Sequence, residues 1–307
     1  MKTGMIYIIG AGAIGKALAV FLKLAHKNVI LLRGSIDDEP GYNQKLQVEL
    51  HDKTELEAEI EVGTLSSFPV LEGLVVLTSK SYGNEHLAQA LKAKTAHSPI
   101  VILQNGLGVE QAFIDHDFPE IYRCVLFVTS QATAPNRIRF KPVSVSRIGI
   151  VKGSSTHLNA AIEQLNNPVF PFQAEPDIQT IIWKKAIINS VFNSVCPLLE
   201  TDNGIFHRDA SVLAIAKRVI AECVAVAQAA GIRLSASEVE EGLLLISKSS
   251  EGQLISTLQD IRNKRKTEIE TLNFAIAGIA RRLDKENLVR ETKLLGELTK
   301  LKSDLCR

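Results

Sequence analysis

A glycine-rich turn between a predicted strand and a predicted helix constrains the fold more than any other segment. Met5–Ile9 is a continuous apolar run, and the apolar pattern of residues 13–25 predicts a helix. The turn that joins them contains Gly10, Ala11, Gly12, Ala13, Ile14 and Gly15. A second apolar run at Val29–Leu32 completes a β-α-β unit, so the G-x-G-x-x-G spacing predicts a dinucleotide-binding turn rather than an ordinary glycine-rich turn.

Each glycine of this turn has a separate predicted role. Gly10 permits the tight turn, and Gly12 lets the backbone approach a pyrophosphate. Gly15 allows the helix to pack closely on the strand, while the helix N-terminus faces the anion. Because the strands of β-α-β units run in the same direction, we expect a parallel sheet.

The alternation of strands and helices continues along the first half of the chain. Apolar runs at 74–78 and 100–103 precede helical patterns at 85–92 and 109–113, as in a doubly wound fold. The remaining predicted elements of this half are a strand at 124–128, antiparallel strands within 137–151 and a helix at 154–165. We therefore predict an α/β fold with a Rossmann-type, doubly wound sheet in residues 1–175.

Long helical segments rich in Ala, Leu, Ile, Lys and Glu fill the second half. They begin near Ile178, after a stretch interrupted by prolines, and we expect breaks at Pro197, Gly204 and Gly231. The predicted second domain is all-α and spans residues 176–307.

Composition narrows the possible partners. The 35 Lys and Arg residues nearly balance the 34 Asp and Glu residues, so nucleic acid is not an expected ligand. No apolar run reaches the roughly 18 residues that a membrane helix needs.

The N-terminal stretch resembles a secretory leader in two respects, a lysine at Lys2 and the triplet Ala17-Leu18-Ala19. It is too rich in glycine for a leader helix, so we expect no leader. The four cysteines are spaced singly, which favours a reducing cytoplasm and no thiolate metal cage.

Arg33 lies at the end of the second predicted strand, the position that contacts the adenosine ribose in dinucleotide-binding folds. Forms that bind NAD usually carry an acidic residue there, whereas an arginine followed by Gly34 and Ser35 can pair with a 2′-phosphate. The alternative is a solvated surface arginine, with Asp37 or Asp38 reaching back to the ribose. We expect NADPH (NADP) rather than NAD.

A polar face interrupts an apolar helix of the second domain. Lys185, Asn189 and Asn193 recur every four residues, so they share one helix face, which we expect to be buried in a polar cleft. The alternative is a lysine that extends to solvent and asparagines that cap loops. Further polar residues at Ser256, Asp260 and Glu268 also lie on helical sequence, and one carboxylate could serve Lys185. Thr267 and Glu270 have the spacing of a capping box that would begin another helix.

This set of residues resembles the ketopantoate reductase family, also called 2-dehydropantoate 2-reductases. The resemblance covers nearly the whole chain and is carried by the turn at 10–15, Arg33, Lys80, Gln104-Asn105-Gly106, Lys185, Asn189, Asn193, Ser256, Asp260 and Glu268. It implies that NADPH and a small 2-oxo acid bind in the cleft between a Rossmann-type and a helical domain. It implies no membrane partner, and the chain could be a monomer or a homodimer.

The resemblance also implies residue roles. Lys185 would be the general acid that protonates the C2 oxygen while hydride reaches C2, and Glu268 would orient Lys185 or hold the substrate hydroxyl. Asn189 and Asn193 would bind the hydroxyl end of the substrate, and Ser256 would bind its carboxylate.

Three further positions have implied roles. Lys80 and Asn105 would lie beside the nicotinamide and its ribose, with Asn105 also close to the substrate. Asp260 would serve as structural support, because a carboxylate does not favour an anionic substrate.

The sequence departs from the family pattern near the substrate residues. Ile255 stands where the family usually has a serine, Thr257 replaces a methionine, and Phe274 replaces a glycine. Substrate identity is therefore less determined than reaction type. The alternatives are an NAD(P)-dependent D-2-hydroxy acid dehydrogenase that acts on another 2-oxo acid, and a nucleotide-sensing protein without catalysis.

Overall fold

The apolar run near the N-terminus forms the central strand of a large sheet. In the computed structural model, which describes residues 4–34, 39–95 and 97–306, β1 (Met5–Ile9) is followed by α1 (Ala13–Leu24) and β2 (Val29–Arg33). The predicted β-α-β unit is confirmed, and β1 and β2 pair in parallel. The chain divides into two units: Met1–Gln104 with Val109–Ile178, and Asn105–Gly108 with Gln179–Arg307.

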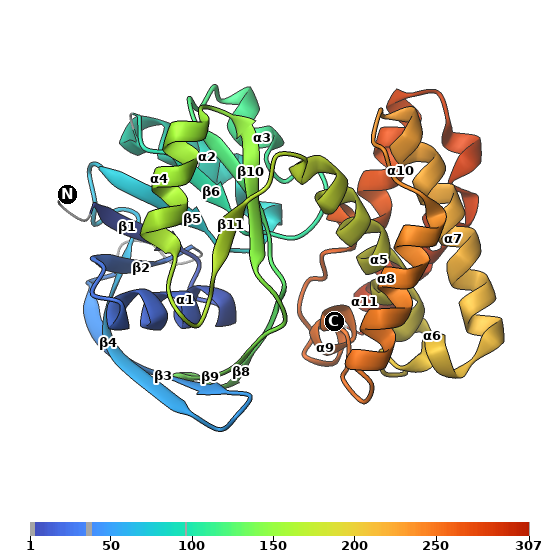
Figure 1. The fold of residues 1–307 in the computed structure, drawn as a ribbon, viewed down its shortest axis with the longest axis horizontal. Helices are drawn as coiled ribbons and strands as arrows, with labels where there is room; N and C mark the ends of the chain where they lie inside the picture. Colours follow the sequence, from blue (N-terminus) through green and yellow to red (C-terminus); the bar gives the residue numbers. More distant parts are fainter. Residues whose placement is uncertain (1–3, 35–38, 96, 307) are drawn as a thin grey trace. The chain divides into compact units, whose positions relative to one another are not determined.

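Six neighbouring strands of the first unit run parallel (Figure 1). Their order across the sheet is β7-β6-β5-β1-β2-β4. Besides β1 and β2, this order contains β4 (Glu55–Thr64), β5 (Gly73–Leu77), β6 (Ile100–Ile102) and β7 (Ile121–Val125). The side chains of β5, β6 and β7 are buried over most of their length, which explains the continuous apolar sequence of β5 and β6. β4 differs, because exposed glutamates alternate with less exposed apolar residues over its first half. The predicted strand at 124–128 begins three residues earlier than expected, at Ile121.

The sheet is parallel at its centre, as the sequence predicts, and antiparallel pairs lie toward its edges. β3 (Tyr42–Leu50) is antiparallel to β4, β8 (Val128–Ala134) to β9 (Arg137–Pro142), and β10 (Ser146–Lys152) to β7. The antiparallel strands expected within 137–151 exist, but β9 pairs with β8 and β3, while β10 pairs with β7 and β11 (Phe172–Ala174). β9 and β10 therefore lie at opposite ends of the strand order.

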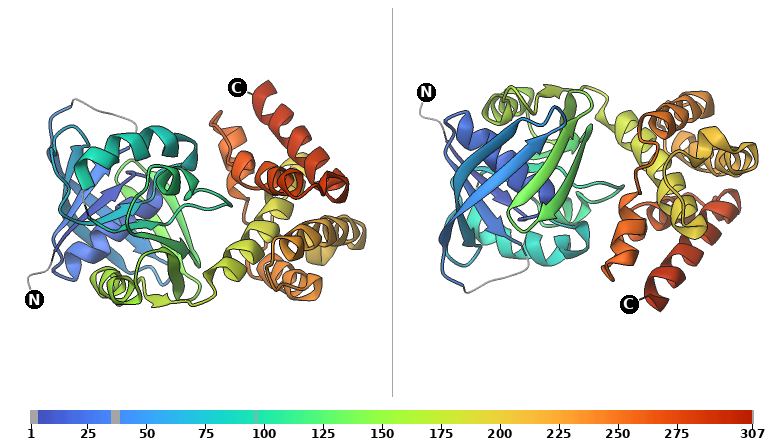
Figure 2. Two further views of the ribbon diagram at one scale, coloured as in Figure 1. Left: turned by 90° about the horizontal axis from the view of Figure 1, so that it is seen from above. Right: turned by 90° about the horizontal axis from the view of Figure 1, so that it is seen from below.

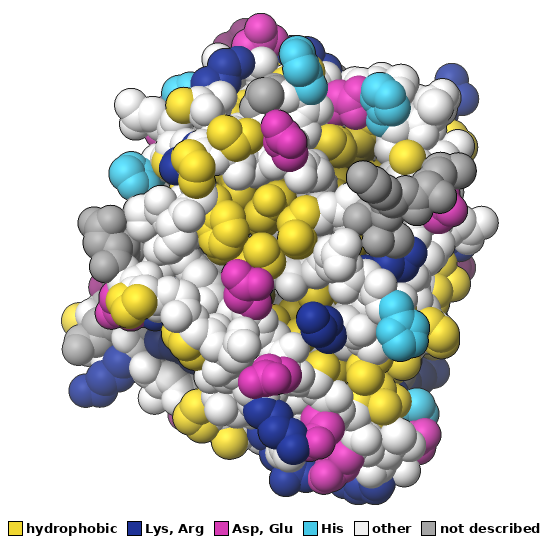
Figure 3. Space-filling view, turned by 90° about the vertical axis from the view of Figure 1, so that its left-hand side faces the viewer, with side chains coloured by type: hydrophobic (Ala, Val, Ile, Leu, Met, Phe, Trp, Pro, Cys, Tyr) yellow, Lys and Arg dark blue, Asp and Glu magenta, His cyan; other side chains and the backbone are white. Residues whose placement is uncertain are grey.

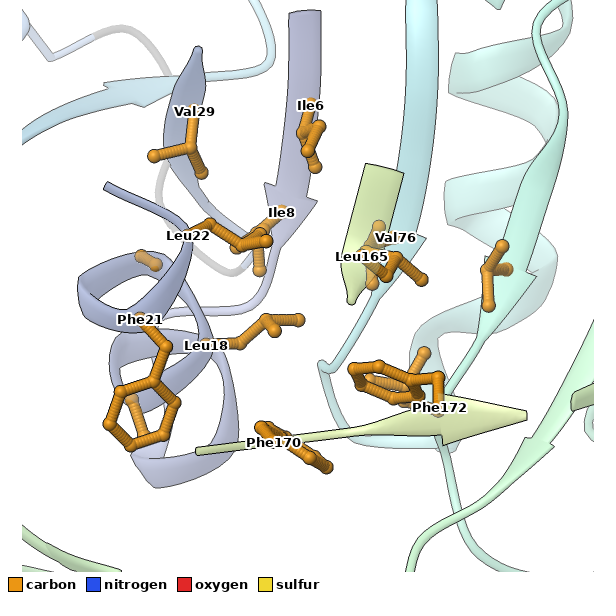
Figure 4. Close-up of a cluster of buried hydrophobic side chains, with 14 of the residues drawn as sticks. Ile6, Ile8, Leu18, Phe21, Leu22, Val29, Val76, Leu165, Phe170 and Phe172 are labelled. Carbon is orange, nitrogen blue, oxygen red and sulfur yellow. The ribbon is translucent and has the colours of Figure 1, made fainter. Parts of the chain in front are cut away.

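Helices cover the two faces of the sheet. α1 and α4 (Ser155–Leu165) pack on one face, and α2 (Asn84–Thr95) and α3 (Gln111–Asp115) pack on the other. Ile6 and Ile8 of β1 lie in the same hydrophobic core as Leu18 of α1 (Figure 4). Tyr7 and Ile9 join the core on the opposite face. This alternation within one strand is the doubly wound arrangement that the sequence predicts.

The sheet curls so that α1 is covered on several sides (Figures 1 and 2). Besides β1 and β2, α1 contacts β3, β4, β8 and β9. Phe21 packs edge to face on Phe140 of β9, with ring centroids 4.9 Å apart. A helix that is apolar on all sides, as α1 is from Ala17 to Leu22, is stable only when it is surrounded in this way.

The second unit is all-α over its described residues, as the sequence predicts. Its helices are α5 (Ile178–Leu199), α6 (Ile205–Arg208), α7 (Ala210–Ala229), α8 (Ala236–Ser249), α9 (Ser256–Arg262), α10 (Asn273–Arg282) and α11 (Arg290–Leu305). Among the described residues, three 3₁₀ turns complete the helical elements: η1 (Ser81–Gly83) in the first unit, and η2 (Ile269–Thr271) and η3 (Glu286–Leu288) in the second.

Two predicted helix boundaries are wrong. Pro197 does not break α5, because it lies near the end of the helix, where Lys302 Nζ donates to its carbonyl at 2.8 Å. The predicted capping box at Thr267 and Glu270 does not form, and α10 begins only at Asn273. Glu270 instead pairs with Lys300 of α11, so a tertiary contact replaces the local one.

None of the helices in the described part of the chain is both long enough and apolar enough to span a membrane.

Candidate cofactor and substrate sites

The glycine-rich turn has the geometry of a dinucleotide cradle. Gly10 has φ of 120°, its N–H donates to the Leu32 carbonyl at 2.8 Å, and its carbonyl accepts from Thr78 Oγ1 at 2.8 Å. A Cβ built on Gly15 would lie 2.0 Å from the Gly10 oxygen, whereas one built on Gly12 meets nothing within 4 Å. Gly10 and Gly15 therefore serve the turn itself, and Gly12 leaves open space where a pyrophosphate would approach.

The first turn of α1 suits an anion. Gly12 is its N-cap and supplies no side-chain cap, and no acidic residue lies in that turn. Its N–H groups can therefore face a phosphate. Lys16 donates to the Pro135 carbonyl at 2.6 Å, and burial lowers the pKa of its ammonium group.

We expect Gly15→Ala to reduce mainly the stability of the protein and Gly12→Ala to reduce mainly its affinity for the nucleotide. Helix propensity favours alanine by about 1 kcal/mol, but overpacking against the Gly10 carbonyl costs about 1–3 kcal/mol or more, so Gly15→Ala should destabilise the protein. Gly12→Ala meets no atom within 4 Å, so its cost should be limited to the ~1 kcal/mol by which glycine exceeds alanine at an N-cap, and it should weaken nucleotide binding. Urea unfolding without nucleotide and a nucleotide titration check both. Equal stability of the two variants would contradict these separate roles of the glycines.

Arg33 ends β2 and is held by neighbours within its own unit. Its guanidinium pairs with Glu39, donates to the Pro40 carbonyl at 3.4 Å and lies 5.3 Å from the centroid of the Tyr42 ring. Arg33 Nε is buried without a hydrogen-bond partner. The other predicted contacts to the ribose or its phosphate, Ser35, Asp37 and Asp38, lie outside the described residues.

A network of buried amides supports the loops at the carboxyl ends of β5 and β6. Asn84 and Gln104 exchange two hydrogen bonds of 2.7 and 2.8 Å, and Asn84 also donates to the Val109 carbonyl at 2.7 Å. Lys80, at the N-cap of η1, is half-buried, and Asn105 is exposed. Asn84 and Thr78 are not among the residues predicted from the sequence, although Thr78 carried a usable signal as a polar residue directly after an apolar run.

The segment Asn105–Gly108 groups with the helical unit rather than with the sheet. Leu107 N donates to the Thr271 carbonyl at 2.9 Å, and Thr271 Oγ1 donates to the Glu268 carbonyl at 3.1 Å. Gly106 has φ of 101°, and a Cβ there would lie 2.5 Å from Thr271 Cβ. The segment that carries Asn105 is thus tied to the η2 turn, where half-buried Glu268 is the N-cap residue.

The predicted polar face of α5 is present but not uniformly buried. Lys185 and Asn189 are half-buried, and Asn193 is buried. Lys185 lies among buried apolar neighbours in sequence, including Trp183 and Ile188. A half-buried lysine on such a surface can meet a ligand without losing all its hydration.

Asn193 acts as a cap for α9, a role that its spacing along α5 does not predict. Its Oδ1 accepts from Thr257 Oγ1 at 2.7 Å, from Ser256 Oγ at 3.2 Å and from Thr257 N at 3.3 Å. Ile255 is the N-cap residue of α9 and forms no side-chain cap, so Asn193 supplies the acceptor from a different helix. This brings Asn193 and Ser256 together, with Ser256 exposed at the helix start.

Two other positions contact their own unit. Buried Asp260 pairs with Arg265 at 3.1 Å, in keeping with a structural role. Phe274 is close to α11, where Lys300 Nζ lies 5.7 Å from its ring centroid and its ring carbons lie 3.6 Å from a Cβ built on Gly296. Within the described residues, no group of three or more His, Cys, Asp and Glu side chains is arranged to hold a metal ion.

Charged side chains of both signs are interspersed on the face shown in Figure 3. No extended patch of one sign covers that face, which agrees with the net charge of +1.

The first unit has a dinucleotide-type turn in an α/β sheet, and the second is all-α with a lysine on a half-buried helix face, an organisation compatible with an oxidoreductase that binds a nicotinamide cofactor. Residues 6–152 match the family described as ketopantoate reductase PanE/ApbA, and residues 177–300 match the C-terminal region of the same family. The chain belongs to the ketopantoate reductase family.

One sequence relative supports this assignment, and two solved structures share the fold. The 2-dehydropantoate 2-reductase of Pyrococcus abyssi (strain GE5 / Orsay) is 27% identical over 282 residues, which are 92% of this chain and 92% of the relative. A PanE/ApbA family ketopantoate reductase from Ralstonia eutropha JMP134 has a TM-score of 0.81 at 23% identity, over 98% of this chain and 99% of that chain. D-mandelate dehydrogenase, solved with NADH and anilino(oxo)acetate, has a TM-score of 0.83 at 20% identity, also over 98% and 99%. At these identities the likeness to solved structures shows the fold only.

Proposed function

We propose that the chain is a 2-dehydropantoate 2-reductase that reduces ketopantoate to pantoate with NADPH, in the synthesis of pantothenate and coenzyme A. The observation that carries the proposal is the half-buried face of α5, where Lys185 and Asn189 lie one helical turn apart in an otherwise apolar helix. The family match in both units supports the same reaction. The four singly spaced cysteines favour a reducing compartment such as the cytoplasm.

Lys185 is the proposed proton donor. When bound, the nicotinamide supplies the hydride that reduces the C2 carbonyl. The C2 oxygen then needs a proton, and Lys185 Nζ donates it as a general acid. Glu268 keeps Lys185 charged or holds the substrate hydroxyl, and Asn189 donates to the same end of the substrate.

Cofactor contacts are proposed for the first unit. Gly10, Gly12 and Gly15 shape the turn for the pyrophosphate, and Arg33 reads the 2′-phosphate. Lys80 and Asn105 face the nicotinamide and its ribose.

Ser256 is the proposed carboxylate contact. Asn193, whose Oδ1 accepts from Ser256 Oγ at 3.2 Å, is proposed to bind the hydroxyl end of the substrate with Asn189. We expect Ser256→Ala to raise KM for the 2-oxo acid more than it lowers kcat, because the contact serves the ground and transition states alike. Ser237→Ala, at an exposed serine of α8, is the matched control. Steady-state kinetics of both variants checks this, and an unchanged KM for Ser256→Ala would place the carboxylate elsewhere.

A steady-state assay of ketopantoate against a panel of 2-oxo acids, with NADPH and NADH, tests the function. We expect the largest kcat/KM for ketopantoate with NADPH. Tight nucleotide binding without turnover of any 2-oxo acid would favour a nucleotide-sensing protein instead.

The second candidate is a D-2-hydroxy acid dehydrogenase that uses NADH. One observation favours it: Glu39 pairs with Arg33, so a carboxylate already lies where a ribose 2′-hydroxyl would need an acceptor. The likeness to D-mandelate dehydrogenase is compatible with this interpretation. Preference for NADH and for an aromatic 2-oxo acid in the same assay would select it.

A further inference from the structure

An exposed segment between α8 and α9 leads directly to Ser256, the proposed carboxylate contact. Residues 248–253 are exposed or half-buried, so apolar burial contributes little to the position of this segment. Residues 202–208, which form the turn after α5 and the short helix α6, hold it through polar contacts. The first of these is between backbones, where Asn203 N donates to the Gln253 carbonyl at 2.9 Å. Polar contacts therefore fix the path of the chain that enters α9.

An arginine and two carboxylates join the same two segments. Arg208 donates to Asp202 through both terminal nitrogens, at 3.1 and 2.8 Å, and its Nη1 also donates to Glu251 at 2.7 Å. Asp202 Oδ1 accepts in addition from Gly204 N at 2.6 Å and from Gly252 N at 3.2 Å. We call Asp202, Arg208 and Glu251 the arginine clamp.

The arginine clamp differs from an ordinary surface ion pair. Its guanidinium meets Asp202 with two donors at once, and a bidentate contact within a network stabilises more than an isolated exposed pair does. The hydrogen bonds from the guanidinium and from backbone N–H groups lower the pKa of Asp202 to about 2. This carboxylate is therefore charged at neutral pH, where the clamp is complete.

Gly204 leaves the space that the guanidinium occupies. A Cβ built on Gly204 would lie 2.3 Å from Arg208 Nη1 and 2.8 Å from Asp202 Oδ1. The φ of Gly204 is −68°, which every residue adopts, so the backbone does not require glycine there. An alanine at this position would have to displace the end of the arginine side chain.

The start of α9 is thus fixed from two sides. Asn193 of α5 accepts from Ser256 Oγ at 3.2 Å and from Thr257 N at 3.3 Å. The arginine clamp holds the preceding chain at Glu251 and Gly252. With both ends of this short stretch held, the Ser256 hydroxyl has a defined position.

We propose that Arg208 is a positioning residue that acts through Ser256 on the binding of the substrate carboxylate, an inference that rests on the proposed function. Arg208→Ala should raise KM for the 2-oxo acid about tenfold, the lower end of the range for loss of a hydrogen bond to a charged group. It should change kcat less than twofold and leave nucleotide affinity unchanged, because the contact serves the ground and transition states alike. Arg218→Ala, which removes an exposed two-bond pair with Glu291 of the same unit, is the matched control and should keep the wild-type KM.

Gly204→Ala tests the clamp without removing a charge. It should raise KM in the same direction by a smaller factor, and circular dichroism checks that both variants are folded. In a Ser256→Ala background neither substitution should raise KM further, because the residue through which Arg208 acts has lost its hydroxyl. An unchanged KM in both Arg208→Ala and Gly204→Ala, or an undiminished increase in the Ser256→Ala background, would overturn the assignment.

Hydrogen exchange separates a failure of the clamp from a failure of the proposed function. The amides of residues 250–258 should exchange several-fold faster in Arg208→Ala than in the wild type, and at the wild-type rate in Arg218→Ala. Unchanged exchange in Arg208→Ala would overturn the clamp itself. If the wild type turned over no 2-oxo acid, the proposed function and the role of Arg208 in carboxylate binding would both be wrong, whereas faster exchange would still show that the clamp holds the segment.

Discussion

Lys185→Ala should lower kcat by about 10² to 10⁴, the usual range for the loss of a general acid, while nucleotide affinity changes little. Lys185 lies on α5 in the second unit, whereas the glycine-rich turn and Arg33 belong to the first. Its removal therefore leaves the proposed cofactor contacts intact. Steady-state kinetics and a separate nucleotide titration measure the two effects.

Lys184→Ala is the matched control for this substitution. Lys184 is the adjacent lysine and is also half-buried, but its side chain approaches Gly242 of α8, where a built Cβ would lie 3.3 Å from Lys184 Cε. We expect Lys184→Ala to retain most of the wild-type kcat. Near-normal turnover in Lys185→Ala, or an equal loss in both variants, would remove Lys185 as the proton donor.

Glu268 should act together with Lys185. If the carboxylate orients or charges the lysine, Glu268→Ala adds little once Lys185 is gone, so the two effects on kcat/KM should be strongly non-additive. A double-mutant cycle measures the coupling. Additive effects would mean that the two residues act separately.

The parallel core was predictable because burial on both sheet faces leaves a continuous apolar run. Met5–Ile9 and Val29–Leu32 carry this signal, and the glycine-rich turn fixes how they connect. An apolar run does not mark β3 and β4, because they alternate instead: residues 55–62 place glutamates between Leu56, Ala58, Ile60 and Val62. A period of two residues is a strand signal, and it was present in the sequence.

Contacts between separate helices explain two features of the helical unit that local sequence rules do not predict. The Thr267 and Glu270 pair has capping-box spacing, but Glu270 binds Lys300, which is 30 residues away in sequence. The spacing of Asn193 places it on the polar face of α5, but spacing does not predict that its oxygen also caps α9, where Ile255 forms no side-chain cap. Neither partner is visible to helix periodicity, since each comes from a separate element.

In the candidate cofactor site, the position of Arg33 could be predicted from the sequence but its contacts could not. Its position at the end of β2 was predictable from the β-α-β unit, but its pairing with Glu39 is a side-chain contact that strand pattern does not determine. The stacked Tyr42 and the carboxylate together hold the guanidinium in one place before any ligand arrives. An arginine fixed in this way loses less side-chain entropy when it binds a phosphate.

Arg33→Ala should weaken NADPH binding by about 10-fold to 150-fold and leave NADH binding nearly unchanged. A charge-assisted hydrogen bond to phosphate contributes about 1.5–3 kcal/mol, which corresponds to that range in affinity. The salt dependence of NADPH binding should also become flatter, because one charge pair is lost. Titration of both nucleotides at several salt concentrations measures these changes, with Arg139→Ala on β9 as an exposed-arginine control.

Glu39→Gln gives the complementary result. The carboxylate competes with a 2′-phosphate for the same guanidinium, so its neutralisation should tighten NADPH binding several-fold and, if Glu39 accepts from a ribose hydroxyl, weaken NADH binding. Opposite shifts for the two nucleotides in Glu39→Gln would identify the Arg33–Glu39 pair as the element that discriminates between them. Equal losses of NADPH and NADH affinity in Arg33→Ala, or a wild-type preference for NADH, would show that Arg33 does not read the 2′-phosphate. The NADH-dependent 2-hydroxy acid dehydrogenase would then be the better description of the enzyme.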